Sequence, residues 1–246
     1  MLWVSRDPDK DPAAHHFLPF VEPSIIVRRF NSGETAGERS PEILVGSAFP
    51  DSGWYRPDPG EELIGLRLRP ETSTAQLGIS PRDYCGVGPA LAPARLNDAL
   101  DPIRSVADQG TVADVARSLW KHLPNLAGSI RNTPATRAAQ FIRSYKGRIS
   151  CRRLAAFLEI SERHLRRVFV DEFGISPKAY TRRIRLTAAV VRAESTTDGW
   201  ADIALAAGYS DQSHLIRDCR ILMGKSPKAL VEERRAMSGF SNNTAA

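Results

Sequence analysis

Two groups of side chains in the second half of the chain have residue types and a spacing suited to recognising nucleic-acid bases. Arginine pairs bidentately with guanine and glutamine with adenine, whereas isoleucine can contact only a thymine methyl group or the sugar-phosphate backbone. Each group falls on the polar outer side of a predicted helix, with a helical bundle that binds no ligand as the alternative. The two groups are Arg163, Arg166 and Arg167, then Gln212, Ser213, Ile216 and Arg217.

Both groups lie in a sequence that is written twice within Leu154–Leu230. His164–Arg167 matches His214–Arg217, and Phe173–Tyr180 matches Met223–Leu230, both at an offset of 50 residues. Just upstream the offset is 49, so one turn is longer by one residue. Chance rarely preserves both identity and register, so the pattern indicates a tandem helical repeat.

The first copy predicts a helix-turn-helix arrangement, in which a short helix and a tight turn precede a longer helix. Leu154–Leu158 is the short helix, Ser161 caps the longer helix, and Gly174 ends it. Apolar residues at i, i+3, i+4 and i+8 place one face of the longer helix in a core. These residues are Leu165, Val168, Phe169 and Phe173.

The second copy repeats this arrangement, with a short helix at Ile203–Ala207, a turn at Gly208–Ser210 and a cap at Asp211. A long helix, Pro177–Ala193, joins the two copies and would hold the two longer helices about 34 Å apart, one turn of DNA. In such motifs the N-terminal residues of the longer helix reach base edges in the major groove. The apolar residues of the joining helix are Ile184, Ala188 and Val191.

Charge is distributed unevenly along the chain, although its net charge is only +6. Residues 1–130 hold 13 basic and 17 acidic side chains, whereas residues 131–246 hold 21 basic and 11 acidic ones. The net charge is therefore −4 in the first part and +10 in the second. A basic module suggests a polyanionic partner, with an unevenly charged solvated face as the alternative.

No pattern in the sequence points to catalysis or to a bound metal. Cys85, Cys151 and Cys219 are far apart and form no CxxC pair or zinc spacing, which favours a reduced cytosol. We expect Cys85 to be a buried structural cysteine rather than a redox or effector thiol. We also expect the adjacent His15 and His16 to be surface residues rather than metal ligands. With no nucleophile elbow and no paired carboxylates, the sequence predicts no enzyme and no cofactor.

The first 70 residues have the pattern of a small antiparallel sheet. Ser24–Phe30, Ile43–Gly46 and Leu63–Pro70 are β-rich runs separated by turns that contain Gly and Pro. We predict a barrel-like or sandwich-like domain from these runs. Residues 1–20 are predicted to be an irregular segment that precedes it.

Helical spacing follows at Ala94–Leu100, Val112–Leu123 and Thr136–Tyr145. The second of these carries one apolar stripe, which we expect in a core, with a dimer seam as the alternative. A break at Leu123–Ser129 predicts a linker, and Thr133-Pro134 supplies an N-cap and a first helical residue. The stripe consists of Val112, Val115, Leu119 and Leu123.

The span Ile149–Leu230 resembles the DNA-binding domain of AraC/XylS-type bacterial transcription regulators. The second copy carries the likeness best, in the stretch Ala201–Leu215 that reads ADIALAAGYSDQSHL. The resemblance implies a seven-helix domain that binds promoter DNA as a monomeric unit with two recognition helices. It also implies that the seven side chains of the two groups are the base-reading residues.

The stretch Glu62–Pro70 resembles, more weakly, the accessory domain found on one branch of these regulators. In that family such domains bind a small effector, dimerise, or do both, and their fold is often a cupin-like β-barrel. The glycine-rich and metal-binding marks of cupins are not visible in this sequence.

The second copy departs from the family pattern in its core and on its surface. Cys219 and Met223 stand where the family usually has Phe, and Leu230 replaces an aromatic residue that Tyr180 retains in the first copy. These exchanges shrink the second core and predict a less rigid one. Asp218 is expected to place a negative charge near phosphate. We therefore expect the first recognition helix to supply more of the affinity.

Together these features predict an α+β chain. A small antiparallel β domain with flanking helices, cupin-like by resemblance, is expected at residues 1–128 as a sensory or dimerisation domain. An all-α DNA-binding domain with two helix-turn-helix motifs joined by a long helix is expected at residues 129–235. Residues 236–246 are expected to be a disordered tail.

The predicted function is that of a sequence-specific DNA-binding transcription regulator, modulated by an effector or by dimerisation. The alternative is a non-specific or architectural nucleic-acid-binding protein without effector control. The expected partners are double-stranded promoter DNA and RNA polymerase, with a small-molecule effector and a second copy of the chain as further candidates. No apolar run is long enough to span a membrane and the start lacks a signal peptide, so we expect a cytoplasmic protein.

Overall fold

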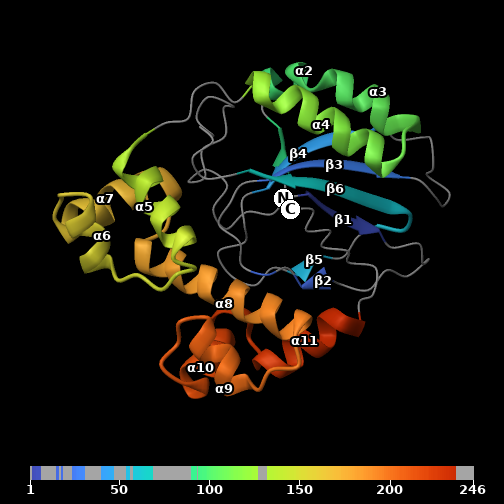
Figure 1. Cartoon of the computed structure of the whole chain (residues 1–246). Helices are drawn as coiled ribbons and strands as arrows, with labels where there is room; N and C mark the ends of the chain where they lie inside the picture. Colours follow the sequence, from blue (N-terminus) through green and yellow to red (C-terminus); the bar gives the residue numbers. More distant parts are fainter. Residues whose placement is uncertain are drawn as a thin grey trace.

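The structure is a computed structural model of the 246-residue chain. It describes residues 2–6, 15–16, 18, 24–30, 40–46, 54–55, 58–68, 90–92, 94–126 and 132–236. A β-rich part with its own helices comes first, and an all-helical part follows (Figure 1). The predicted α+β class is therefore confirmed.

The N-terminal part is built on a five-stranded antiparallel sheet with the strand order β1-β6-β3-β4-β7. In register, Val27 of β3 lies between Ile43 of β4 and Ile64 of β6. The described strands form an open sheet and do not close a barrel. The strands are β1 (Leu2–Arg6), β3 (Ser24–Phe30), β4 (Glu42–Gly46), β6 (Glu61–Arg67) and β7 (Ala90–Leu91).

The prediction that residues 1–20 are irregular is wrong for two segments. Leu2–Arg6 is an edge strand paired with β6, and His15–His16 (β2) pairs with Trp54–Tyr55 (β5) in a second, two-stranded sheet. Strands this short carry too little alternation to be read from sequence, because pairing with a distant strand decides their conformation. Cys85 lies outside the described residues.

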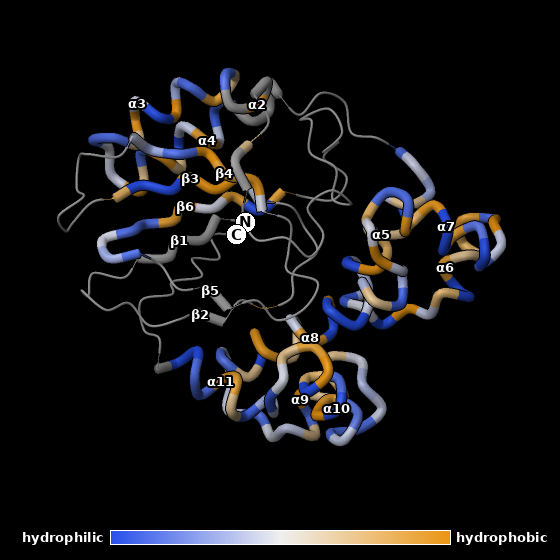
Figure 2. The backbone as a smooth tube through the Cα atoms, turned by 180° about the vertical axis from the view of Figure 1, so that it is seen from behind, coloured by the Kyte–Doolittle hydropathy of each residue, from blue (hydrophilic) through white to orange (hydrophobic). Residues whose placement is uncertain are grey.

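Helices α2 (Ala94–Ala99), α3 (Asp101–Gln109) and α4 (Val112–Leu126) lie together over one face of the sheet (Figure 1). Their apolar sides and the inward residues of β3, β4 and β6 form one hydrophobic cluster, seen as adjacent orange segments in Figure 2. Val115 and Leu119 are both fully buried there, so the expectation of a core stripe is confirmed for them. The side chain of Leu123 lies outside the described residues.

Two features of these helices differ from expectation. Helix α3 was not predicted; it starts directly after α2 and has Pro102 in its first turn. The predicted break at Leu123 is wrong, because α4 continues to Leu126. The helix continues through Pro124, which has no N–H and so removes one helical hydrogen bond.

Seven helices form the described C-terminal part, residues 132–236. This is the number that the resemblance implies. The first unit, α5 to α7 with the start of α8, surrounds one hydrophobic cluster, and the second, the rest of α8 with α9 to α11, surrounds another (Figure 1). The helices are α5 (Pro134–Ser144), α6 (Cys151–Phe157), α7 (Glu162–Phe173), α8 (Pro177–Ser195), α9 (Trp200–Ala206), α10 (Gln212–Met223) and α11 (Pro227–Ala236).

The long helix α8 belongs to both units. Its Tyr180 is buried in the first cluster, whereas Leu186, Val190 and Ala193 are buried in the second. The stripe predicted for this helix is wrong, since Val191 is 49% exposed and its other two members are half-buried. A helix that serves two cores buries a different side in each half, so a single periodic stripe does not describe it.

One described residue of the N-terminal half contacts the second unit. Leu18 is 1% exposed and belongs to the hydrophobic cluster of α8 to α11. None of the described helices is both long enough and apolar enough to cross a bilayer.

Candidate nucleic-acid interface

The first recognition helix, α7, is fixed at both ends and along its inner face. The Ser161 hydroxyl accepts a hydrogen bond from the backbone N–H of His164 at 3.1 Å, and Gly174 ends the helix in the left-handed conformation. Phe169 and Phe173 are buried, with ring centroids 4.7 Å apart. The predicted cap, inner face and end of this helix are therefore confirmed.

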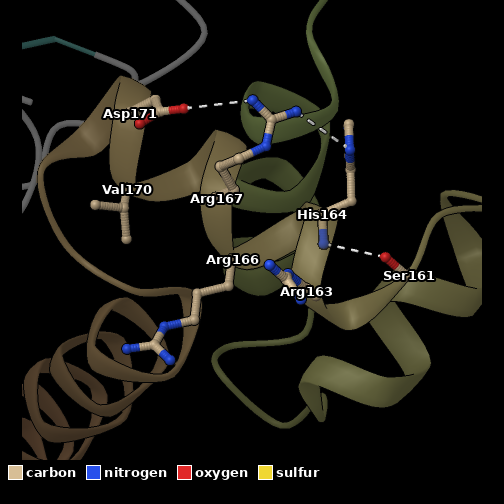
Figure 3. A pocket seen from close by; sticks show the side chains of 7 residues that line it. All are labelled: Ser161, Arg163, His164, Arg166, Arg167, Val170 and Asp171. Atoms are coloured by element: carbon tan, nitrogen blue, oxygen red, sulfur yellow. Dashed lines mark hydrogen bonds and ion pairs between the residues drawn. The ribbon is translucent and has the colours of Figure 1, made fainter.

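The outer face of α7 brings the three predicted arginines together. All three are exposed, and they line one open hollow of about 610 Å³ at the surface (Figure 3). A concentration of guanidinium groups on one helix face is suited to an anionic partner such as a nucleic-acid groove. The residues that line the hollow are Ser161, Arg163, His164, Arg166, Arg167, Val170 and Asp171.

Arg167 is held between two neighbours on its own helix. Its Nη2 lies 3.4 Å from Nδ1 of His164, and its Nη1 lies 3.9 Å from Oδ2 of Asp171 (Figure 3). The side chain of Arg167 is 64% exposed, so these contacts direct its guanidinium without burying it. Contacts that reduce the rotamer freedom of an arginine before binding lower the entropy lost when it meets a partner.

The second recognition helix, α10, begins at an acidic cap. Asp211 accepts hydrogen bonds from the backbone N–H of His214 at 2.7 Å and from Oγ of Ser210 at 2.9 Å. These hydrogen bonds, that of His214 first, hold the pKa of the Asp211 carboxyl below its usual value. The His214 ring also packs edge-on against Tyr209, with centroids 5.1 Å apart. The predicted cap at Asp211 is confirmed.

The predicted contact residues of α10 are less uniform than those of α7. Gln212, Ser213 and Arg217 are exposed, whereas Ile216 is half-buried. Among these four predicted contact residues of α10, one is an exposed cation. All three predicted contact residues of α7 are exposed cations. The predicted contact residues are thus basic on α7 and mainly neutral and polar on α10.

The expectation that Asp218 places a negative charge near phosphate is wrong. Asp218 is 5% exposed, and its Oδ1 accepts hydrogen bonds from Nε and Nη2 of Arg182 on α8 at 3.0 and 2.7 Å. A carboxylate held in a buried ion pair with a partner on another helix has little of its charge left for solvent.

The sequence contained a signal for this ion pair. Asp218 falls on the buried stripe of α10 between Leu215, Cys219 and Leu222, at i, i+3, i+4 and i+7. A charged residue on an apolar stripe requires a partner inside the fold. The partner itself was not identifiable, because Arg182 is 36 residues away in sequence.

The second core has smaller side chains at the matching positions, but it is well buried. Cys219 and Met223 are 0% and 1% exposed, at the positions occupied in the first unit by Phe169 and Phe173. Burial, with a smaller contribution from the Asp218 charge, raises the pKa of the Cys219 thiol to about 12. The thiol is therefore neutral at physiological pH and acts as a small apolar side chain.

No metal site accompanies these helices: the described residues contain no group of three or more His, Cys, Asp or Glu side chains that could hold an ion.

The comparison with protein families identifies this part of the chain. Residues 154–233 match the model of a helix-turn-helix domain of the AraC type. This part of the chain is therefore similar to the helix-turn-helix domain of AraC-type transcription regulators.

Two solved structures are similar to part of the chain. The C-terminal domain of AraT, a response regulator from Geobacillus stearothermophilus, is 28% identical and covers 42% of this chain and 87% of its own, with a TM-score of 0.40. A probable AraC family transcriptional regulator from Rhodopseudomonas palustris is 27% identical over 41% of this chain and 95% of its own, with a TM-score of 0.36.

ToxT from Vibrio cholerae is similar over nearly the whole chain. It covers 94% of this chain and 97% of its own at 9% identity, with a TM-score of 0.51. This likeness shows a shared fold that includes the N-terminal sheet as well as the helical part. No curated protein matches the chain.

Proposed function

We propose that the protein is a transcription regulator that reads two adjacent major-groove segments of promoter DNA, one with α7 and one with α10. The observation that carries the proposal is the arrangement of the two helices. Each is capped at its N-terminus and buries its inner face, and six of the seven predicted contact residues are exposed, with Ile216 half-buried. One continuous helix of 19 residues, α8, joins the two units.

The proposed contacts are unequal in the two helices. On α7, Arg163, Arg166 and Arg167 would pair with guanine or with phosphates. On α10, Gln212 and Arg217 offer bidentate pairing with adenine and guanine. The half-buried Ile216 is left to contact a thymine methyl group or the backbone. Ser213, which is exposed beside them, can pair with any base edge.

Selection of bound DNA from a random pool tests this proposal. We expect the selected fragments to share two short conserved segments whose centres lie about 10 base pairs apart. The affinity for such a fragment should exceed that for random DNA by about 10³-fold or more at physiological salt. Equal affinity for every sequence would instead support the alternative, a non-specific or architectural DNA-binding protein.

The N-terminal half is proposed to regulate the DNA-binding part, either by binding a small effector or by dimerising. Support comes from its separate hydrophobic core and from the contact of Leu18 with the second unit, which connects the two parts. A thermal-shift screen of metabolites, with the molar mass measured in parallel, distinguishes the two modes. Stabilisation by a compound supports an effector, and a concentration-dependent dimer without any such compound supports dimerisation.

RNA polymerase is the further partner that a regulator of promoters requires, and the cytoplasm is the expected location. A transcription assay reconstituted with purified polymerase on the selected promoter tests the first point. A change in transcript level that depends on both the protein and its DNA segments is the expected result.

A further inference from the structure

We propose that a cluster of contacts around the N-terminal half of α8 sets the angle between the two recognition helices. Its members are positioning residues: they act on DNA through the placement of α7 and α10 and do not touch bases. We call this cluster the junction. The inference about geometry stands on the contacts alone, and its consequence for DNA rests on the proposed function. The junction consists of Gly147, Arg148, Arg182, Arg185, Gly208, Tyr209 and Asp218.

A connecting helix alone does not fix this angle. Tyr180 near the start of α8 is buried in the first unit, and Leu186 one and a half turns later is buried in the second. The helix fixes the separation of the units along its axis. Rotation about that axis and bending between the two cores are restrained only by contacts that reach from one unit to the other.

The first such contact is the ion pair between α8 and α10. Arg182 precedes the residues of α8 that enter the second core, yet both its Nε and its Nη2 donate to Oδ1 of Asp218. The carboxylate side chain is 8% exposed and the guanidinium side chain 30%. In the first unit the position that corresponds to Asp218 is Val168, so this contact is not a feature of the repeat. It ties the second recognition helix to the start of α8.

The second contact joins the two units directly. Gly208, in the turn before α10, has φ +88°, and a Cβ at this residue would collide with Cγ of Arg148, which follows α5 in the first unit. The aliphatic part of the Arg148 side chain therefore lies across the turn of the second helix-turn-helix motif. In the first unit, Glu159 occupies the corresponding left-handed position with φ 57° and carries a full side chain.

The same loop of the first unit is held to α8. Nε of Arg185 donates to the carbonyl oxygen of Gly147 at 2.6 Å. A Cβ at Gly147, which has φ +75°, would lie 2.7 Å from Cγ of Arg185 and 3.0 Å from the Thr181 carbonyl oxygen. The segment Gly147-Arg148 thus contacts α8 with one residue and the second unit with the next.

Tyr209 closes the junction. It is 3% exposed, lies next to Gly208, and is near enough to Asp218, Arg182 and Arg185 for their charges to act on its phenol. Burial is the main cause that raises the pKa of this phenol. Its hydroxyl has no hydrogen-bond partner among the described residues. Tyr209 therefore adds a buried ring to the junction, beside its charged residues.

Three variants loosen the junction in different ways. Asp218→Val introduces the residue of the first unit, Arg182→Gln removes the half-exposed cation, and Gly208→Ala displaces Arg148. The matched control is Arg192→Gln. Arg192 lies on the same helix and also pairs with an aspartate, Asp198, but within the second unit, with side chains 45% and 33% exposed. Thermal unfolding of each variant is recorded first, and Arg182→Gln is the variant expected to fold most like the natural chain.

The angle is measured on the full chain without DNA. Spin labels are attached to Glu162→Cys on α7 and Ile221→Cys on α10, both exposed positions, with Cys85 and Cys151 changed to Ser and the buried Cys219 retained. Double electron–electron resonance measures the distance between the two labels. It should give a narrow distance distribution for the natural junction and for the Arg192→Gln control. We expect a distribution about twofold broader, or a shifted one, for the junction variants. Unchanged distributions in both Arg182→Gln and Asp218→Val would overturn the inference.

The consequence for DNA is measured on the selected fragment. Two linked binding modules gain from linkage only when both can bind at once, so a loosened junction should weaken binding to a two-segment fragment about tenfold. Binding to fragments that keep only one segment should change less than about twofold. Equal losses of affinity on all fragments, with the label distances still narrow, would mean that these residues contribute only to the stability of the fold. If the natural chain shows no sequence preference, the proposed function fails while the distance measurement still decides the inference.

Discussion

The first recognition helix, α7, packs on aromatic rings, whereas the second, α10, packs on smaller side chains. Phe169 lies 4.7 Å from Phe173 and 5.4 Å from Tyr180 between ring centroids. The corresponding residues of the second unit, Cys219 and Met223, are no more exposed than the rings they replace. The exchange therefore changes the types of side chain in the core and not their exposure to water. Equal burial does not make the two units equivalent.

The second unit contains aromatic and ionic contacts that the first unit lacks. Tyr209 is buried in its turn, where the first copy has the half-buried Ile160. Asp218 pairs with Arg182 where the first copy has Val168. The ion pair joins α10 to α8, and the Tyr209 ring packs edge-on against His214 of α10. Both units therefore use α8, the first through Tyr180 in its aromatic core and the second in addition through a buried ion pair with α10.

The largest effect that tests this comparison is expected in the two cores. Phe169→Ala removes a ring that is 0% exposed and should lower the free energy of unfolding by about 3–5 kcal/mol. Cys219→Ala removes one sulfur atom at the matching position and should cost about 1 kcal/mol. Denaturant unfolding followed by circular dichroism measures both. Equal losses at the two positions would contradict the view that only the first core depends on its aromatic residues.

A smaller effect is expected on the binding surfaces. Arg167→Ala should weaken binding to the selected DNA by about 1–3 kcal/mol and relax specificity at one base pair. Arg217→Ala on α10 should cost less, because the other three predicted contact residues there are uncharged and bind fewer phosphates. Arg153→Ala on α6 is the control, as it removes an exposed arginine outside both recognition helices. Fluorescence anisotropy at several salt concentrations measures the losses.

Each outcome of that experiment assigns a role to Arg167. A loss that is confined to one base pair makes it a base contact. A uniform loss over all sequences, with a salt slope smaller by about one, makes it a phosphate contact. A larger loss for Arg217→Ala than for Arg167→Ala would reverse the proposed order of the two helices.

Because of the repeat, the helices of the C-terminal half could be predicted from the sequence. Periodic apolar residues, serine or aspartate caps and glycine ends are local signals, and they predicted α7 and α10 with their inner faces. The same signals failed for α8, because a helix shared by two cores has no single apolar stripe. The sequence also identified which side chains of α7 point outward, since that follows from periodicity alone.

Features that depend on distant residues were not predictable. The Leu2–Arg6 strand exists through its pairing with β6, about 60 residues later, and Leu18 is buried against a unit in the other half of the chain. The junction belongs to the same class, because Arg148 and Gly208 are unremarkable in sequence until the two units are placed together. The sequence therefore predicts the helices and the core of each unit. It does not predict the contacts that join one unit to the other.

The smallest effect is expected at the helix caps, where the two units also differ. Ser161→Ala should cost about 1 kcal/mol of stability at any pH, because the serine hydroxyl that caps α7 does not titrate. The cap of α10 is the Asp211 carboxylate, which is ionisable and exposed. Asp211→Ala should therefore lower the Tm at pH 7, and the size of this loss should depend on pH.

The direction of that dependence follows from the lowered pKa of Asp211. Its folded-state pKa lies below the usual value of 3.8, so the stabilisation is fully present above that value and is lost as the pH falls through the folded-state pKa. The difference in Tm between the natural chain and Asp211→Ala should then shrink below about pH 4, while the Ser161→Ala difference stays constant. Thermal melts between pH 7 and pH 3 measure both differences. A pH-independent difference for Asp211→Ala would mean that the cap of α10 contributes through shape and not through charge.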